Sequence, residues 1–263
     1  MVSERYDISR AISNAAYKAY ENRVLSEIRE RELPHHIAII MDGNRRFASE
    51  LSMRPLSGHL KGKNKLEEVL EWCIEIGIRM LTVYAFSTEN FRRSKDEVNS
   101  LMAIFADSFK KAGDDERVHK HKIRIRAIGQ RDMLPSHVRD AIAYAEERTK
   151  TYSDYHLNIA IAYGGREEIL RAIKSIASDV LSGKVKVEDI NEKLFANYLY
   201  TADLPDPDLV LRTSGEERIS NFLLWQLAYS ELYFADVYWP GFRKIDFLRA
   251  IRSYQLRQRR FGT

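Results

Sequence analysis

Short apolar runs alternate with amphipathic patterns along most of the chain. The runs have strand length and cover 37–41, 81–86, 123–128, 157–162 and 208–211, with a sixth at 232–237. Helical patterns lie between them at 63–76, from 94 to about 112, from 135 to about 148 and at 167–181. This alternation predicts an α/β fold with a central, mostly parallel six-stranded sheet flanked by helices. Because no Pro/Gly/Ser-rich linker divides the chain, we expect a single domain.

The first 34 residues carry a different pattern and end at a proline, Pro34. Their apolar residues recur at roughly helical spacing among charged ones, at Ile8, Ile12, Ala15, Ala16, Ala19, Val24, Leu25 and Ile28. We therefore predict an amphipathic helical extension over 1–34 and a main domain over 35–263. The extension packs against the body or a partner subunit, or else makes transient contact with a membrane, which its mixed charges disfavour.

Polar residues follow four of the predicted strands. Asp42 comes after the first strand, 87–90 after the second, 164–166 after the fourth, and Arg212 and Thr213 after the fifth. Because ligands of parallel sheets bind at the carboxyl ends of the strands, these residues should meet at one edge. The sequence thus predicts a binding site there.

The segment after the first strand has the residue types that a diphosphate site needs. Mg²⁺ is commonly held by one or two carboxylates together with substrate phosphates, and Asp42 is placed for that role. Gly43 lets a backbone approach a ligand closely, and Asn44, Arg45 and Arg46 supply donors for phosphate oxygens. An ordinary polar turn is the alternative, which two consecutive arginines disfavour.

A second group of cations comes late in the chain. The donors expected at the same edge are Arg46, Arg93, Arg212, Arg218, His59, Asn44, Asn90 and Ser220, and the carboxylates are Asp42 and Glu231. One diphosphate hardly needs two separate arginine groups. We therefore expect two anionic substrates and one divalent ion.

Composition narrows the function further. The net charge of +4 suits anionic substrates, an anionic membrane surface or nucleic acid, but we find no recognition helix or RNA-binding motif and expect no nucleic acid. No P-loop motif occurs, so side chains and turn amides must bind phosphate. The single Cys73 excludes an internal disulfide, and no secretory signal or membrane-spanning run is evident. We expect a cytoplasmic protein.

Five blocks of sequence, in order, resemble the signatures of the cis-prenyltransferases, the family of undecaprenyl and dehydrodolichyl diphosphate synthases. They are 35–48, 58–62, 84–91, 158–166 and 208–234, so the resemblance covers nearly the whole chain from about 35 to 262. It implies that 35–263 is a cis-prenyltransferase catalytic domain. The implied reaction condenses isopentenyl diphosphate units onto an allylic primer, geranylgeranyl or farnesyl diphosphate, giving a polyprenyl diphosphate for glycosyl-carrier lipid synthesis.

The resemblance also implies roles for single residues. Those beside the primer's diphosphate would be Gly43, Asn44, Arg45, Arg46, Phe47, Arg54 and His59. Those at the isopentenyl diphosphate would be Arg212, Arg218, Ile219 and Ser220. The reacting centre between them would be lined by Ser87, Thr88, Glu89, Asn90, Phe91 and Arg93. Mg²⁺ would be held by Asp42 and Glu231, which opposite subunits of a homodimer would be able to supply.

Asn90 stands where the family's proton acceptor is often placed. An amide is a poor base, so we expect Asn90 to orient substrate while a diphosphate oxygen or Asp42 takes the proton. Apolar residues of the helices at 63–76 and 98–109 should line a channel for the product or else belong to the core. Ala85 is by resemblance a candidate determinant of chain length.

Some positions depart from the bacterial members of the family. Bacterial members typically carry Gly and Trp where this chain has Arg45 and Phe47, and this difference resembles the archaeal and eukaryotic branch of the family. Glu217 replaces a His that some members have.

The chief alternative function is that of a catalytically silent subunit of a heteromeric prenyltransferase. The predicted carboxylates and arginines are all present, and 260–262 looks like the tail that reaches a neighbouring site, so an active homodimer leads. Its oily product would bring it to a membrane surface.

Overall fold

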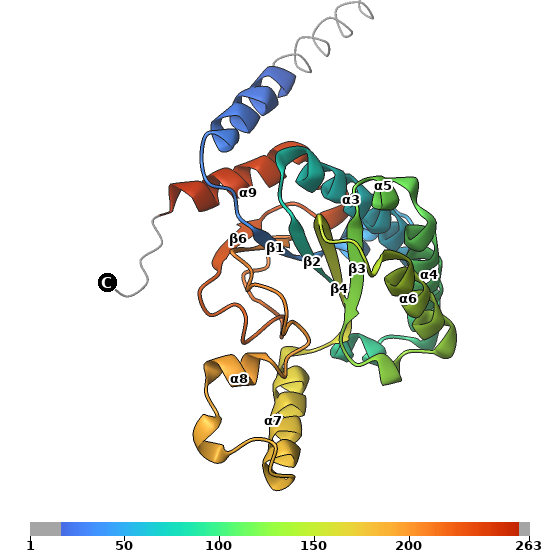
Figure 1. Cartoon of the computed structure of the whole chain (residues 1–263). Helices are drawn as coiled ribbons and strands as arrows, with labels where there is room; N and C mark the ends of the chain where they lie inside the picture. Colours follow the sequence, from blue (N-terminus) through green and yellow to red (C-terminus); the bar gives the residue numbers. More distant parts are fainter. Residues whose placement is uncertain (1–16, 258–263) are drawn as a thin grey trace, which may run out of the picture.

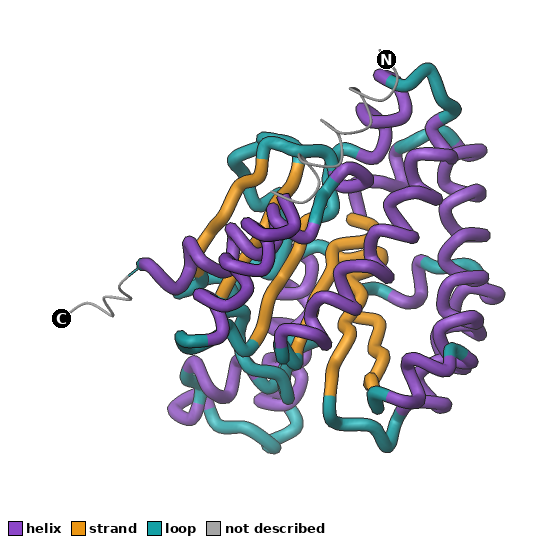
Figure 2. The backbone as a smooth tube through the Cα atoms, turned by 90° about the horizontal axis from the view of Figure 1, so that it is seen from above, coloured by secondary structure: helices purple, strands orange, loops and turns teal. Residues whose placement is uncertain are grey.

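The computed structural model describes residues 17–257, and within them six strands form one central sheet (Figures 1 and 2). The strands are β1 (His36–Ile40), β2 (Met80–Ser87), β3 (Ile123–Ile128), β4 (Tyr155–Tyr163), β5 (Leu209–Thr213) and β6 (Glu231–Ala235). Their order is β3-β4-β2-β1-β5-β6, and every neighbouring pair is parallel. The predicted α/β fold and six-stranded sheet are confirmed, and the sheet is parallel throughout.

Helices pack beside the sheet, and Figure 1 shows α3, α4 and α6 gathered on one side with α7 and α8 projecting away from it. The α-helices are α2 (Asn44–Glu50), α3 (Pro55–Ile76), α4 (Lys95–Asp114), α5 (Glu116–Lys120), α6 (Ser136–Thr149), α7 (Gly165–Leu181), α8 (Glu192–Ala196) and α9 (Lys244–Leu256). The 3₁₀ turns are η1 (Thr88–Arg92), η2 (Arg131–Met133), η3 (Val187–Asp189) and η4 (Trp239–Gly241).

Two helices differ from the prediction in ways that affect the site. The helix predicted over 63–76 begins at Pro55, because proline suits the first helical turn, and this puts His59 on α3. The second helix was not predicted: directly after Asp42 and Gly43, the residues Asn44–Glu50 form α2, with Gly43 as its N-cap. Both changes place predicted site residues on rigid elements.

Strand β1 divides the core into two layers. Ile37 and Ile39 belong to the larger cluster, whereas Ala38 and Ile40 belong to the smaller cluster on the other face. Because successive side chains of a strand point to opposite faces, a run that is apolar throughout has to be covered on both sides. The continuous burial of β1 thus fixes it at the centre of the sheet.

Residues 17–29 are helical and pack against the body of the protein. Val24 and Ile28 are fully buried in the larger core cluster, and the Gln255 amide of α9 donates to the Ile28 carbonyl at 2.9 Å. The predicted packing is confirmed for this part. The predicted apolar positions Ile8, Ile12, Ala15 and Ala16, and the tail at 260–262, lie outside the described residues. Among the helices that are described, none is both long and apolar enough to cross a bilayer.

Candidate active site

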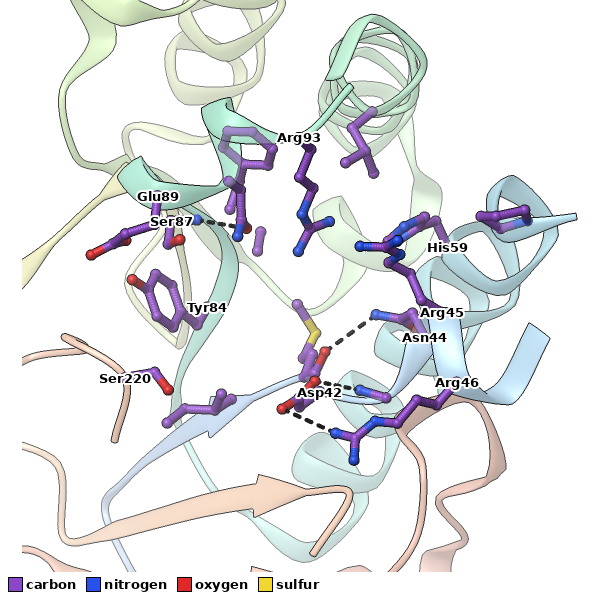
Figure 3. Close-up of a pocket in the computed structure, with 18 of the residues that line it drawn as sticks. Asp42, Asn44, Arg45, Arg46, His59, Tyr84, Ser87, Glu89, Arg93 and Ser220 are labelled. Atoms are coloured by element: carbon purple, nitrogen blue, oxygen red, sulfur yellow. Dashed lines mark hydrogen bonds and ion pairs between the residues drawn. The ribbon is translucent and has the colours of Figure 1, made fainter. Parts of the chain in front are cut away.

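A large cavity of ≈ 1080 Å³ opens at the carboxyl ends of β1, β2 and β5 (Figure 3). The chain leaves β1 toward β2 on one side, and β5 pairs with β1 on the other, so this is the point where the strand order reverses. The predicted site residues that line the cavity are Asp42, Gly43, Asn44, Arg45, Arg46, His59, Ser87, Glu89, Asn90, Arg93, Arg212 and Ser220. The sheet topology therefore brings residues far apart in sequence to one edge.

Other predicted residues do not line this cavity: Phe47, Arg54, Thr88, Phe91, Arg218 and Ile219. Phe91 packs edge-on against Phe86, with ring centroids 4.9 Å apart, and Ile219 packs against the smaller core cluster. Arg54 is the N-cap of α3. The Arg218 guanidinium is largely exposed and pairs with Glu216.

Our expectation that Glu231 shares an edge with Asp42 in one chain is wrong. Glu231 is the first residue of β6 and pairs with Leu209, the first residue of β5. Asp42 follows Ile40, the last residue of β1, and Ile40 pairs with Arg212 of β5. Because Arg212 lies three residues after Leu209, about 10 Å along the strands separates the level of Ile40 from the level of Glu231. In a parallel sheet the first residue of a strand lies at the amino edge, opposite the site. There the Glu231 carboxylate accepts from Arg257 at 2.6 Å.

Asp42 and Arg212 form the charged centre of the cavity. Arg212 Nη2 donates to Asp42 Oδ2 at 2.7 Å, and Arg46 Nη2 lies 3.6 Å from the same oxygen. Arg212 Nη1 donates to Ser220 Oγ at 2.8 Å and to the Arg218 carbonyl. The Arg212 side chain is only 4% exposed, so these acceptors compensate a charge that would otherwise be costly to bury. Its Nε is buried without a hydrogen-bond partner in the described structure.

Gly43 is required here by backbone geometry. Its φ of +101° is in the left-handed region, and a Cβ would lie 2.7 Å from Tyr238 Cδ1. From the sequence we expected a glycine here because it lets a ligand approach the backbone. The structure adds a second reason, since a side chain at this position would collide with Tyr238. Its N–H donates to Asp42 Oδ1 at 2.7 Å, which fixes the orientation of that carboxylate.

A second group of cations surrounds Glu97. Arg93 Nη1 donates to Glu97 Oε1 at 3.0 Å, and His59 Nε2 and Arg45 Nε lie 3.6 and 3.8 Å from that oxygen. Figure 3 shows Arg93, Arg45 and His59 directed toward a common space. Burial and the Arg93 charge lower the pKa of His59 below its usual value.

Sequence reasoning missed this role of Glu97. In the sequence, Ser94 and Glu97 have the spacing of a helix capping box, and the Glu97 N–H does donate to Ser94 Oγ at 3.4 Å. The carboxylate, however, turns to the cavity's cations instead of capping the helix. No local signal distinguishes the two roles, because the cations come from α2, α3 and the loop before α4.

The segment at 87–93 is held by its own polar side chains. Asn90 Oδ1 accepts from the Ser87 N–H at 3.1 Å, so Asn90 acts as a cap within η1. Asn221, which was not predicted, donates to Glu89 Oε1 at 3.0 Å and to Glu167 Oε2 at 3.2 Å. Its φ of +63° is uncommon for a residue other than glycine. Asn221 thereby joins the ends of β2 and β4 to the loop that carries Ser220.

A smaller, apolar cavity of ≈ 190 Å³ lies between α3 and α4. It shares Met41, Asn44, His59, Ala85 and Leu101 with the charged cavity, so the two are contiguous. The predicted channel residues that line it are Leu66, Leu70, Ile74, Leu101, Ile104, Phe105 and Phe109. Val69 and Met102, also candidates, are instead fully buried in the core.

The residues of the charged cavity are compatible with Mg²⁺. Within residues 17–257 no three His, Cys, Asp or Glu side chains gather as a metal site. Mg²⁺ needs no such cage, because it retains water and is usually held by one or two carboxylates with substrate phosphates. The Asp42 carboxylate, 31% exposed and next to Arg46, has the accessibility for this role.

Comparisons with known proteins agree with this geometry. A family model described as putative undecaprenyl diphosphate synthase matches residues 40–262. The tritrans,polycis-undecaprenyl-diphosphate synthases (geranylgeranyl-diphosphate specific) of Thermoplasma volcanium and Thermococcus kodakarensis are each 58% identical over 255 residues, covering 97% of this chain and 99% and 97% of theirs.

Solved structures agree as well. Lavandulyl diphosphate synthase from Lavandula x intermedia, in complex with dimethylallyl diphosphate, has a TM-score of 0.83 and 39% identity. A probable undecaprenyl diphosphate synthase from Campylobacter jejuni has a TM-score of 0.71 and 36% identity, and each match covers 88% of this chain and 99% of the other. The chain therefore belongs to the undecaprenyl diphosphate synthase family of cis-prenyltransferases.

Proposed function

We propose that this enzyme condenses isopentenyl diphosphate units in cis onto geranylgeranyl diphosphate, giving a polyprenyl diphosphate that serves as precursor of a glycosyl-carrier lipid. The choice of primer follows the specificity in the names of the relatives from Thermoplasma volcanium and Thermococcus kodakarensis. The same relatives are named as enzymes and match nearly the whole chain, so the alternative of a catalytically silent subunit gains no support.

The observation that carries the proposal is the contact between the two cavities. The charged cavity bears Asp42, Arg46 and Arg212, and the apolar cavity starts at Ala85 and Leu101. A substrate with a diphosphate at one end and a hydrocarbon chain at the other fits such a pair of spaces. Neither a polar metabolite nor a free hydrocarbon needs both.

Two substrates would divide the charged cavity between them. We assign the primer's diphosphate to the Asn44, Arg45, Arg46 and His59 side, and isopentenyl diphosphate to Arg212 and Ser220. Arg218 would need to turn from Glu216 toward the cavity to join them. The guanidiniums stabilise the charge that develops on the departing diphosphate.

Asp42 would hold Mg²⁺, with substrate oxygens and water as the remaining ligands. When bound, the ion supplies further charge stabilisation to the leaving diphosphate. Asn90, fixed by the Ser87 N–H, orients the reacting segment, and the proton from the isopentenyl unit passes to a diphosphate oxygen or to Asp42. The apolar side chains around Ala85 exclude water from the cation-like allylic carbon.

Two arginines of the charged cavity form ion pairs with carboxylates of the chain itself. Asp42 pairs with Arg212, and Glu97 pairs with Arg93 at 3.0 Å. Anionic substrates would compete with these carboxylates for the guanidiniums, and Asp42 would have to leave Arg212 in order to hold Mg²⁺. The charges of Arg212 and Arg93 are thus compensated, and both side chains already line the cavity.

A homodimer completes the proposal. Glu231 lies at the amino edge of its own sheet, so it can ligate the ion at Asp42 only if a partner subunit brings its own copy there. The enzyme would be cytoplasmic and would meet the membrane surface through its lipid product.

The test is direct synthesis by the purified chain. With Mg²⁺, isopentenyl diphosphate and, separately, farnesyl or geranylgeranyl diphosphate, we expect polyprenyl products by mass spectrometry and preference for geranylgeranyl diphosphate. Activity that appears only after a second polypeptide is added would contradict the proposal in favour of the silent-subunit alternative. Equal use of both primers would refute the primer assignment alone.

A further inference from the structure

The apolar cavity ends in charged side chains. Most of its walls are hydrophobic, and besides Lys63 and Lys111 its charged lining residues are Glu67, Glu71, Asp115 and Arg117. We call these four residues the Arg117 cluster. Nothing in the proposed chemistry uses them, and charged groups are unexpected around a space for hydrocarbon.

The direction of the helices places the Arg117 cluster at the end away from the diphosphates. Helices α3 and α4 follow β1 and β2, so both run from the site's edge of the sheet toward the amino edge. His59 of α3 lines both cavities, and Glu71 lies twelve residues further along the helix, at about 18 Å. Leu101 and Asp115 mark the same two ends on the other wall.

A single guanidinium holds the Arg117 cluster together. Arg117 Nη1 donates to Glu71 Oε1 at 2.6 Å, and Nη2 donates to Glu67 Oε2 at 3.1 Å and to Asp115 Oδ2 at 2.7 Å. Glu67 and Glu71 belong to α3, whereas Arg117 lies on α5 and Asp115 is the N-cap of α5. The Arg117 cluster therefore ties α5 to α3, which lie side by side in Figure 1.

This arrangement changes the energetics of chain growth along the cavity. Each added isoprene unit gains by leaving water for apolar walls such as Leu70, Ile74 and Phe109. At the Arg117 cluster the chain tip would instead displace water from ionic groups, which is unfavourable. It would also have to separate α3 from α5. One exposed ion pair resists little, but a guanidinium shared by three carboxylates forms a network.

We propose that the Arg117 cluster closes the far end of the apolar cavity and thereby limits the length of the product. The inference rests on the proposed function, because it needs an enzyme that extends a hydrocarbon chain into this space. It assigns a specificity role to charged residues outside the diphosphate site. A purely structural role of the Arg117 cluster in holding α5 would leave product length unchanged.

The main test replaces Arg117 with alanine and measures the product distribution by mass spectrometry with geranylgeranyl diphosphate and excess isopentenyl diphosphate. We expect Arg117→Ala to shift products to longer chains, since three carboxylates without their cation repel one another and open the end. The matched control is Arg131→Ala, which breaks the ion pair with Glu146 on a residue of similar exposure, 44% against 48%, that lines neither cavity. Its products should match those of the wild type.

Further variants act on the same end of the cavity. Ala112→Phe adds bulk to the lining near the Arg117 cluster and should shorten the products. Arg117→Lys retains the charge but not the fork that reaches three carboxylates, so its products should be intermediate. If Arg117→Ala does not fold, Arg117→Lys and Ala112→Phe decide the question.

The results distinguish failure of the role proposed for the Arg117 cluster from failure of the proposed function. Unchanged product length in folded Arg117→Ala, or an equal shift in Arg131→Ala, overturns the role of the Arg117 cluster while leaving the proposed function intact. A wild-type chain that extends no primer refutes the proposed function, and the inference with it. The rate of the first condensation, measured alongside, distinguishes altered length from lost activity.

Discussion

Arg212 and Asp42, 170 residues apart in sequence, meet at 2.7 Å across the carboxyl ends of β5 and β1. The contact joins the ends of the two strands at the point where the sheet order reverses, and it pairs Asp42 with an arginine whose side chain is only 4% exposed. Because the guanidinium also holds Ser220, a change at Asp42 reaches both proposed diphosphate positions. The strand order, which places β5 next to β1, thus brings together two side chains to which we assign roles in the reaction.

Replacing Asp42 with asparagine tests this centre. The amide keeps the shape but loses the charge that would hold Mg²⁺, so we expect kcat to fall by about 10²–10³-fold, the range typical for removal of a group that stabilises transition-state charge. Steady-state kinetics with both diphosphates measure this. Glu50→Gln is the control, because Glu50, the last residue of α2, accepts from Tyr238 and does not line the cavity. Near-wild-type turnover by Asp42→Asn would argue against the assigned role.

Ala85 lies at the junction of the two cavities, which makes it a second test of the proposed path. A leucine there projects into the space that the growing chain has to cross. We expect Ala85→Leu to give shorter products with primer diphosphate binding retained, as read from mass spectra and KM. Ala106→Leu, on α4 but absent from the lining of both cavities, serves as control. A product distribution identical to wild type would remove Ala85 from the path.

Glu97→Gln tests the cation group around His59. The carboxylate opposes the influence of burial and Arg93 on that histidine, so its loss should lower the pKa of His59 still further. A pH titration of the histidine ring signals by NMR measures the change. His156, whose pKa is lowered mainly by burial with Arg124 next, lies among other residues and should not respond. A rise or no change at His59 would contradict the proposed contact.

The sequence was sufficient to predict the sheet and its functional edge, for a physical reason. Runs such as 37–41 are apolar on both faces, which only a central strand tolerates, and polar residues directly after such strands have to emerge at the carboxyl edge. Asp42 and Arg212 were found in this way. Their contact was not, because pairing depends on strand order, which local patterns do not specify.

Residues whose roles depend on distant partners were missed or misplaced. Glu97 reads as a capping residue, and its cations come from other elements. Asn221 looks like a loop residue until the ends of β2 and β4 approach it. Glu231 was placed by its family block, whereas strand register decides which edge it occupies. In each case tertiary structure supplies what sequence spacing lacks.

A buried histidine away from the cavity, His36, should make the stability of the protein depend on pH. His36 Nδ1 donates to the Pro205 carbonyl at 2.7 Å, and Nε2 accepts from Thr82 Oγ1 at 2.7 Å, so the neutral ring is fully satisfied. Burial lowers the pKa of His36 to about 4, although the Pro205 carbonyl and Asp208 act to raise it.

Below about pH 6.5 the His36 ring of the unfolded chain becomes protonated, whereas the ring in the folded protein stays neutral down to about pH 4. Stability should therefore fall as the pH drops through this window, by about 3 kcal/mol in all. Urea unfolding at a series of pH values measures the slope, and His36→Gln, which retains a donor and an acceptor without titrating, should lose that part of it. Parallel pH dependences for the two proteins would mean that His36 does not remain neutral for the reason given.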